Sequence, residues 1–532
     1  MSTFLIRGGS VIDGSERLAF KADVQVIDGV IANVGEVLKG DERGKVIDGS
    51  DLTITPGFID MHAHSDLAVI SDPNHLSKVT QGVTLEVVGQ DGLSYAPTNE
   101  PTQQEIREQL FGWNGNPSNI DWSFKSIAEY LDYVDKGAPV NVAFLIPHGN
   151  VRMLVKGSEP GIATANELGA MQAIVEQGMR EGAVGLSAGL TYTPAMYADD
   201  NELIALNSVV AKFGGYYAPH HRNYGRDFLK AVSDCIEIAQ ASRAALHLTH
   251  CHMSSPQYHG KTELLFDMIS DGANRGVDIT LDTYPYLAGM TYLHALLPSW
   301  VQAGGIETMR ARLREPEVRS RVIHELMVTG SDGAHGNTLN FETIVIAGVE
   351  KATEFVGMRF DEAAKRAGKD PVDFYLDFLD SENYKVSAVL HGGHEPNVRA
   401  IMKHPRHMVG SDGILVGNRP HPRGYGTFAR YLGVYGRDEQ VLTFEGAVAR
   451  MTGRPAQRLR LVDRGLVKVG YRADLVLLHR ESVIDRATYE QPRVPAAGFV
   501  HVWIDGISTL WDGSRTDNLP GRAVRLIDKK GV

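Results

Sequence analysis

The sequence predicts an α/β protein, a parallel barrel joined to a small β module that both chain ends build. Three observations predict this class. Strand-like runs alternate with helical segments from His64 onward, which is typical of a parallel barrel or a doubly wound sheet. No glycine-rich phosphate loop follows these strands, which argues against a nucleotide-binding doubly wound sheet. Short β-type runs separated by turns occupy both ends of the chain.

The N-terminal module is expected to span residues 1–56. Asp28-Gly29 separates two β-type runs of this module, and this dipeptide predicts a two-residue hairpin turn. No residue here suggests chemistry, so we expect a structural module. Its β-type runs lie at residues 4–7, 24–27 and 31–34.

The barrel is expected to span residues 57–463. Thr164 and Glu167 have capping-box spacing in front of an amphipathic run, which predicts a helix there. A short buried strand at residues 58–60 opens the barrel. The strands predicted after it lie at residues 83–88, 140–146, 184–187, 215–218, 245–250, 278–282 and 407–412.

Residues 287–345 depart from this alternation. Pro298, the pair Gly304-Gly305 and a charged helix-like run suggest an insertion over the barrel mouth. β-type runs return in the tail, and the simplest packing joins them to the N-terminal module. We therefore expect one β-sandwich domain built from residues 1–56 and 464–532.

Composition excludes several classes of function. The net charge of −12, from 53 basic and 65 acidic residues, argues against nucleic-acid and anionic-membrane partners. Two cysteines, Cys235 and Cys251, exclude a disulfide framework. The N-terminus lacks a basic segment with a long apolar core, and no apolar run reaches the length of a membrane span. We expect a cytoplasmic protein with a small-molecule substrate, and the sequence leaves its oligomeric state open.

The strongest chemical signal is His62-Ala63-His64 at the end of the first barrel strand. Residues i and i+2 of a strand face the same side, so both imidazoles can reach one ion. The motif alone is equally compatible with two structural histidines. Other predicted strands also end in His or Asp, as a barrel that gathers ligands at one rim requires. The residues collected in this way are His62, His64, Asp91, His220, His250 and Asp412.

Four imidazoles and two carboxylates suit a borderline-soft divalent ion, zinc first. A zinc-bound water loses its proton near neutral pH and can attack a carbonyl carbon. A nearby carboxylate must accept that proton and return it to the leaving group. Asp412, on the turn 410–413 after an apolar strand, is the candidate. Taken singly, each residue is better explained as a capping Asp or a core His, whereas the set favours a metal site.

Ordered motifs along nearly the whole chain resemble the amidohydrolase superfamily and, within it, the N-acyl-D-amino-acid deacylases (D-aminoacylases). These motifs are Pro56-Gly57-Phe58-Ile59-Asp60 with His62 and His64, Gly185-Leu186-Ser187, Tyr217-Ala218 with His220, Thr249-His250, Tyr284-Pro285-Tyr286, Gly410-Ser411-Asp412-Gly413, His421-Pro422-Arg423 and Ala473-Asp474-Leu475-Val476. The resemblance implies a distorted TIM (β/α)8 barrel with a small β-sandwich formed from both chain ends.

The resemblance also implies roles for the collected residues. His220 and His250 would hold a tightly bound zinc ion, and Asp412 would act as general acid/base. His62 and His64 would line a second, often weakly occupied metal position. A family cysteine ligates the metal where this chain has Asp91, a harder ligand able to bridge two ions, so two occupied sites or Mn²⁺ are expected. Glu86, on the same strand, is an alternative ligand but is better explained as a salt-bridged barrel residue.

The predicted substrate pocket also departs from the family. Tyr284 and Arg423 remain where the family holds a substrate carboxylate, and a planar guanidinium suits that task. A family lysine is replaced by His252, and a family serine by Met290. These changes weaken the expectation of a D-configured α-carboxylate. His148 is expected either to face the pocket or to make a structural hydrogen bond at the rim. The other histidines, His221, His247, His391, His394 and His421, are expected to be structural.

Three hypotheses follow. The leading one is a zinc-dependent hydrolase that deacylates N-acyl-D-amino acids. The second keeps the chemistry but takes a cyclic amide, ureide or carbamate, because of Asp91, His252 and Met290. The third, a non-catalytic barrel scaffold, is the weakest because every expected histidine ligand and Asp412 are present.

Overall fold

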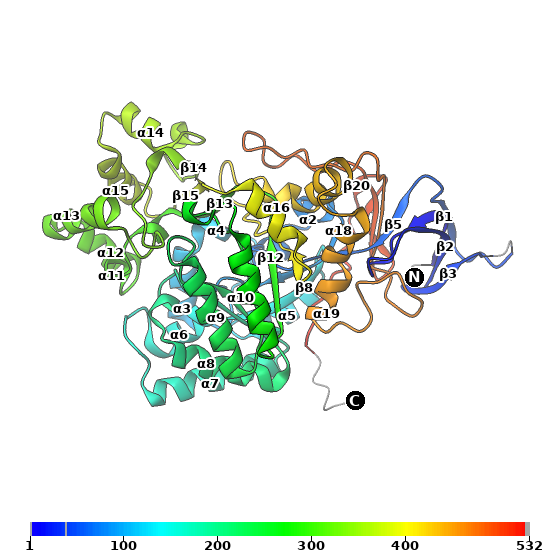
Figure 1. Ribbon diagram of the computed structural model, residues 1–532, viewed down its shortest axis with the longest axis horizontal. Helices are drawn as coiled ribbons and strands as arrows, with labels where there is room; N and C mark the ends of the chain where they lie inside the picture. Colours follow the sequence, from blue (N-terminus) through cyan, green and yellow to red (C-terminus); the bar gives the residue numbers. More distant parts are fainter. Residues whose placement is uncertain (1–2, 38–39, 527–532) are drawn as a thin grey trace.

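Eight parallel strands form the centre of the molecule in a computed structural model, which describes residues 3–37 and 40–526 (Figure 1). Nearly all of their residues are buried, as in a sheet covered on both faces. The strands are β6 (Phe58–Asp60), β7 (Val83–Val88), β8 (Asn141–Pro147), β9 (Gly185–Gly189), β10 (Tyr216–His220), β11 (Ala245–Leu248), β12 (Ile279–Thr283) and β16 (His407–Val409).

The sheet closes into a barrel between its two short edge strands. The strand order is β16-β12-β11-β10-β9-β8-β7-β6, so β6 and β16 are the ends that must meet. Ala63 forms a parallel bridge with Gly413, and the Asp412 N–H donates to the His62 carbonyl at 2.8 Å. Closure therefore runs through the residues just beyond the two strands. The predicted distorted TIM barrel is confirmed.

Helices between the strands cover the outside of the barrel (Figure 1). The predicted capping box is present, because Thr164 and Glu167 satisfy each other's backbone N–H groups at the start of α7. The helices outside the insertion are α1 (Ala68–Ser71), α2 (Leu76–Val79), α3 (Glu100–Gln109), α4 (Phe111–Asn114), α5 (Ile127–Asp135), α6 (His148–Lys156), α7 (Ala165–Arg180), α8 (Asp200–Phe213), α9 (Phe228–Ser242), α10 (Thr262–Asn274), α16 (Glu395–Lys403), α17 (Arg423–Arg430), α18 (Phe444–Met451) and α19 (Gly453–Arg458).

The insertion is longer than the expected residues 287–345. Its three antiparallel strands are β13 (Ala288–Tyr292), β14 (Ile344–Gly348) and β15 (Ser387–His391), and β15 lies between the other two. The insertion therefore continues to His391, because its central strand is the last in sequence. It also contains α11 (Ser299–Gln302), α12 (Ile306–Leu313), α13 (Pro316–His324), α14 (Phe360–Ala367) and α15 (Pro371–Ser381). These helices and the terminal sheet lie at opposite ends of the long axis (Figure 1).

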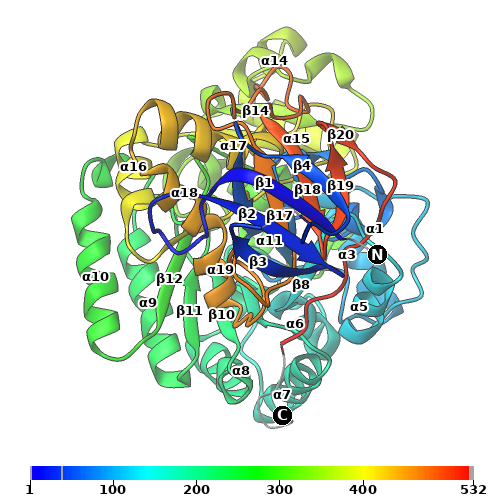
Figure 2. The ribbon, with the colours of Figure 1, turned by 90° about the vertical axis from the view of Figure 1, so that its right-hand side faces the viewer.

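Strands from near both ends of the described chain form one nine-stranded sheet beside the barrel (Figure 2). Its strands are β1 (Phe4–Val11), β2 (Phe20–Ile27), β3 (Val30–Gly35), β4 (Lys45–Asp48), β5 (Thr53–Pro56), β17 (Leu475–Leu478), β18 (Phe499–Ile504), β19 (Ile507–Trp511) and β20 (Ser514–Arg515). The predicted hairpin turn joins β2 to β3, with positive φ at Asp28 (51°) and Gly29 (81°).

The terminal sheet folds back on itself into the predicted β-sandwich. Phe4 on β1 stacks on Trp503 on β18 with ring centroids 4.9 Å apart, although β5 and β17 separate those strands. Neighbouring strands lie about 4.8 Å apart in a sheet, so a flat sheet could not bring these rings together.

The end of the described chain does not follow the expected assignment of residues 464–532 to the sandwich. Gly521 and Ala523 form bridges with Ala138 and Val142, so residues 519–526 pack on the barrel. This segment lacks an alternating pattern that would have revealed its partner. Residues 1–2, 38–39 and 527–532 of the expected sandwich domain lie outside the described residues. No helix within residues 3–37 and 40–526 is long and apolar enough to cross a membrane.

Candidate metal centre and active site

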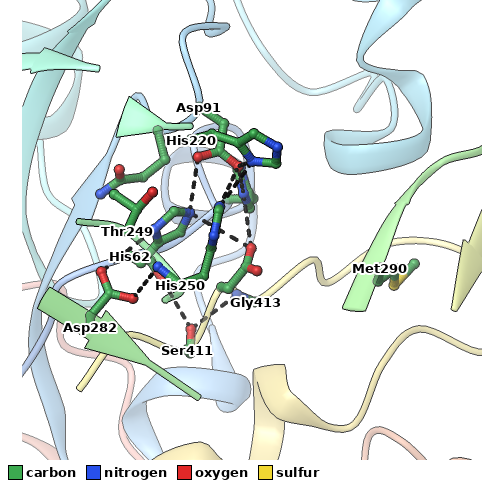
Figure 3. Close-up of polar contacts among 12 residues, drawn as sticks. His62, Asp91, His220, Thr249, His250, Asp282, Met290, Ser411 and Gly413 are labelled. Atoms are coloured by element: carbon green, nitrogen blue, oxygen red, sulfur yellow. Dashed lines mark hydrogen bonds and ion pairs between the residues drawn. The ribbon is translucent and has the colours of Figure 1, made fainter. Parts of the chain in front are cut away.

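The six collected residues meet at the C-terminal rim of the barrel. Figure 3 labels His62, Asp91, His220 and His250 among them. Each one ends or follows a barrel strand, and none is more than 7% exposed. Convergence at this rim is what a TIM barrel does with side chains at its strand ends. The residues are His62, His64, Asp91, His220, His250 and Asp412.

Asp91 belongs to two groups of ligand atoms at once. The first group contains His62, His64, Asp91 and Asp412, and the second contains Asp91, His220 and His250, with the atoms of each group within 4.8 Å of one another. Asp91 Oδ2 lies 3.4 Å from both His220 Nδ1 and His250 Nε2. Asp91 Oδ1 lies 3.6 Å from His62 Nε2. Both carboxylate oxygens thus face imidazoles, as a ligand shared by two ions requires.

Three of these residues have left-handed backbone conformations. φ is 53° at Asp91, 29° at His250 and 50° at Asp412. Such conformations cost about 1–3 kcal/mol for a non-glycine residue and persist only where the surroundings hold them. Each follows a barrel strand directly or closely, so the strained turns aim the polar side chains into the rim.

The buried polar atoms of the centre fit a metal ion. Both ring nitrogens of His62 and Oδ1 of Asp91 are buried and have no hydrogen-bond partner in the described part of the chain. An unpaired buried polar group costs about 1–3 kcal/mol, and coordination would satisfy His62 Nε2 and Asp91 Oδ1. Burial disfavours the Asp91 carboxylate, but the imidazoles of His250, His62 and His220 outweigh it and hold the pKa of Asp91 well below its usual range. An ionised carboxylate among imidazoles is a donor set suited to zinc and, being harder than a thiolate, to manganese.

Neighbouring side chains fix the orientation of the imidazoles. Thr191 Oγ1 lies 2.8 Å from His220 Nε2, and the Tyr224 hydroxyl lies 3.0 Å from His250 Nδ1. Asp282 Oδ2 lies 3.8 Å from His62 Nδ1. Partners of this kind set the ring orientation and basicity of a ligating histidine. Sequence reasoning missed all three, although Asp282 ends a predicted strand, the signal that had found Asp412.

Asp412 lies between the centre and Arg423. Its Oδ1 is 3.1 Å from His64 Nε2, and its Oδ2 is 2.9 Å from Arg423 Nη1. Burial disfavours the carboxylate, but Arg423 and His64 more than offset this, so the pKa of Asp412 is lowered. Asp412 is therefore an anion with one oxygen toward the metal ligands and one toward a guanidinium.

A cavity of about 490 Å³ opens above these residues. Tyr284, His252 and Arg423, which were expected to bind substrate, line this cavity, and so does Met290. Arg423 lies over the Tyr284 ring, 4.4 Å from its centroid. His252 Nε2 lies 2.6 Å from Thr283 Oγ1, and burial, His250 and Arg423 lower the pKa of His252 to about 3. His252 is thus a neutral group and does not replace a cationic lysine. In Figure 3 Met290 lies apart from the ligand cluster, on β13.

The cavity wall contains residues that sequence reasoning did not assign to it. Trp113 packs beside the His64 ring, with centroids 4.6 Å apart. His335, from the insertion, and His391, expected to be structural, also line the cavity. No local motif marks these residues: the insertion brings His335 and His391 to the site, whereas Trp113 lies on α4, between β7 and β8.

Two other expected residues are structural. His148 Nε2 lies 2.7 Å from Glu202 Oε1, which matches the alternative of a structural contact at the rim. Glu86 forms an ion pair with Lys78 at 3.6 Å and accepts a hydrogen bond from Ser65, so it is not among the grouped ligand atoms.

A parallel barrel whose C-terminal rim collects buried imidazoles and carboxylates under a cavity defines a metal-dependent barrel enzyme. A model of the amidohydrolase family matches residues 45–509. The chain belongs to the amidohydrolase family, as its motifs had indicated.

Individual relatives match over nearly their whole length. A D-aminoacylase from Alcaligenes xylosoxydans xylosoxydans is 31% identical over 524 residues, 98% of this chain and 97% of that protein. An N-acyl-D-glutamate deacylase of the same organism is 31% identical over 522 residues, 98% of this chain and 96% of that protein. The structure of N-acyl-D-glutamate deacylase from Bordetella bronchiseptica, complexed with zinc and a phosphonate inhibitor that mimics the tetrahedral intermediate, is similar with a TM-score of 0.83. Its sequence identity is 30%, with 98% of this chain and 99% of that chain covered.

Proposed function

We propose that this protein is a zinc-dependent hydrolase of N-acyl-D-amino acids with an uncharged side chain. The observation that carries the proposal is the shared position of Asp91 between two ligand groups, below a cavity that also contains Asp412 and Arg423. The similarity to D-aminoacylase and N-acyl-D-glutamate deacylase supports cleavage of the same kind of C–N bond.

In this proposal His220, His250 and Asp91 would hold one ion, and His62, His64 and Asp91 would hold a second. When bound, such ions act as Lewis acids on the scissile carbonyl and lower the pKa of water. Mn²⁺ is an alternative occupant, because a bridging carboxylate is a hard ligand. Thr191 and Tyr224 would orient His220 and His250 so that each presents an unprotonated ring nitrogen to a bound ion.

Asp412 is the proposed general acid/base. Its carboxylate is ionised and therefore ready to accept the proton of the attacking water. The proton then passes from Asp412 to the nitrogen of the leaving amine as the C–N bond breaks. Arg423 keeps the side chain in place through the ion pair at 2.9 Å.

The cavity supports a substrate with a single carboxylate. Arg423 is the one lysine or arginine among the described residues that line it, and its buried Nε has no hydrogen-bond partner among them. Arg423 and Tyr284 would hold the α-carboxylate. A second carboxylate on the substrate side chain would have no cation beside it. Apolar groups instead form much of the wall, including Trp113, Met290, Leu296, Leu339, Ile344 and Leu390.

A cyclic amide, ureide or carbamate is the second candidate substrate. The ion pair between Arg423 and Asp412 favours it, because a guanidinium engaged by a protein carboxylate is a weaker partner for a substrate carboxylate. The neutral His252 and the thioether of Met290 point the same way.

A substrate panel tests the proposal. We would measure kcat/KM for N-acetyl-D-leucine, N-acetyl-D-methionine, N-acetyl-D-glutamate, a hydantoin and an N-carbamoyl amino acid. The two substrates with uncharged side chains should exceed N-acetyl-D-glutamate by about 100-fold or more in kcat/KM, because an unpaired buried side-chain charge is strongly disfavoured. Faster turnover of the ring or carbamoyl substrates would instead establish the second candidate, and no turnover of any of them would refute both.

A further inference from the structure

The geometry points to Lys78 as a positioning residue that joins the loop carrying His62 and His64 to the loop carrying Asp412. Lys78 lies on α2, outside the residues that line the cavity, and it is 0% exposed. Lysine is almost never fully buried unless it is paired, so its partners must be strong ones. These partners come from three different barrel strands or their ends.

The Lys78 ammonium contacts two carboxylates and a hydroxyl. Nζ lies 2.5 Å from Asp60 Oδ2, 3.0 Å from Ser411 Oγ and 3.6 Å from Glu86 Oε2. All three partners are 0% exposed. Asp60 ends β6, Glu86 lies on β7, and Ser411 precedes Asp412. A single cation therefore ties together the strand ends that carry the first group of ligands.

Asp60 holds both loops through their backbones. Its Oδ1 accepts the Ser411 N–H at 2.8 Å and the His62 N–H at 3.2 Å. Its Oδ2 accepts the Ser411 hydroxyl at 2.6 Å. Ser411 Oγ in turn accepts the Gly413 N–H at 3.1 Å, on the far side of Asp412 (Figure 3). Lys78, Asp60, Glu86 and Ser411 are called the Lys78 cluster below. Hydrogen bonds from this cluster thus hold the backbone on both sides of Asp412, which has a left-handed conformation.

Glu86 extends the cluster to His64. The hydroxyl of Ser65, the residue after His64, donates to Glu86 Oε2 at 2.6 Å. His75 Nε2 lies 2.9 Å from Glu86 Oε1. The cluster therefore fixes the backbone on the C-terminal side of His64 as well as on the N-terminal side of His62.

The ammonium stays charged inside the protein. Burial disfavours the charge, but Asp60 and Glu86 outweigh it and raise the pKa of Lys78. Without this cation two buried carboxylates would repel each other beneath the centre. A displacement of about 1 Å at a reacting group can lower a rate about 100-fold, so the consequence would appear in catalysis as well as in stability.

Three variants test the inference. Lys78→Met removes the cation, and Ser411→Ala removes only the hydroxyl that links Lys78 and Asp60 to the Asp412 turn. Arg152→Met is the matched control, because Arg152 is also 0% exposed and ion-paired, to Glu202, but outside the cavity lining. Folding is checked by circular dichroism. The readouts are kcat and KM separately, together with zinc content and affinity measured by dialysis against a competing chelator.

We expect kcat to fall about 100-fold in Lys78→Met and about 10-fold in Ser411→Ala, with KM changed less than about threefold. Zinc affinity of the site that His62 and His64 line should fall about 10-fold in both variants, because both histidines lie on one of the two joined loops. Arg152→Met should lose thermal stability while its folded fraction keeps wild-type kcat and zinc binding.

Ser411→Ala decides the question if Lys78→Met does not fold, because it strands no buried charge. Wild-type kcat and zinc affinity in Ser411→Ala, or in a folded Lys78→Met, would overturn the inference and leave the cluster purely structural. The kinetic readout rests on the proposed function, whereas zinc affinity does not. If the wild type does not turn over the proposed substrates but zinc affinity falls in these variants as expected, only the proposed substrates are refuted.

Discussion

Asp91 is the residue that the two groups of ligand atoms share. Its two oxygens face imidazoles of both ligand groups, at 3.4 Å from His220 Nδ1 and 3.6 Å from His62 Nε2. The sequence could predict this residue because it follows an apolar strand in a series of such strands. It could not predict Thr191 or Tyr224, because their contacts depend on the three-dimensional course of loops.

Replacing Asp91 with Asn tests its place between the two groups. The amide keeps the shape but loses the charge and one anionic oxygen, so we expect bound zinc to fall below one ion per chain. We also expect kcat/KM to fall about 100-fold or more. Elemental analysis of dialysed protein and steady-state kinetics measure both quantities.

Asp91→Cys is the matched variant, because a thiolate keeps an anionic ligand with a single donor atom. It should retain about one zinc ion per chain and lose any activation by Mn²⁺. Full metal content and activity in Asp91→Asn would show that Asp91 is not a ligand.

At the scale of elements, a buried ionic contact joins α6 to α8 beside the barrel. His148 and Arg152 on α6 both contact Glu202, in the first turn of α8, and each is at most 1% exposed. An acidic residue in the first turn also interacts favourably with the helix dipole. The sequence left His148 undecided, because its partner Glu202 lies far along the chain.

Acid should reveal the contribution of Glu202 to stability. Burial opposes ionisation, but His148 and Arg152 outweigh it, so the folded-state pKa of Glu202 is below the ordinary value of 4.5. A lowered carboxyl pKa stabilises the fold above the ordinary pKa, and this contribution is lost as pH falls through the folded value. We expect wild type to exceed Glu202→Gln in urea midpoint at pH 7, with the difference shrinking as the pH is lowered from about 5 toward 3.

The other carboxylates are the same in both proteins, so the difference isolates Glu202. A difference that is constant between pH 7 and 3 would contradict the ion-pair account of this contact.

Strands and helix ends could be predicted from the sequence where neighbouring residues determine them. Apolar runs bounded by turns placed the barrel strands, and the spacing of Thr164 and Glu167 placed the start of α7. The end of the insertion was not predictable, because β15 pairs with β13 and β14, which lie about a hundred and about forty residues earlier in the chain. The packing of residues 519–526 on the barrel was missed for the same reason.

At the scale of the whole molecule, the barrel places one ligand set and one insertion at the same rim. Strand ends supply the metal ligands and Asp412, and the insertion supplies cavity residues such as His335 and Leu339. The metal ligands could be predicted from the series of strands along the sequence, because every parallel strand of the barrel ends at that rim. The cavity wall required the structure, because it forms between the insertion and the barrel.

We propose that hydrolysis by this protein requires bound metal and is selective for the D enantiomer of the substrate. The most direct measurement is free-amine release from N-acetyl-D-leucine and its L enantiomer, by metal-stripped enzyme before and after addition of zinc. We predict no turnover by stripped enzyme, and recovery with zinc for the D enantiomer, with Asp412→Asn inactive in both states. Turnover by metal-stripped enzyme equal to that after addition of zinc, or a preference for the L enantiomer, would contradict this proposal.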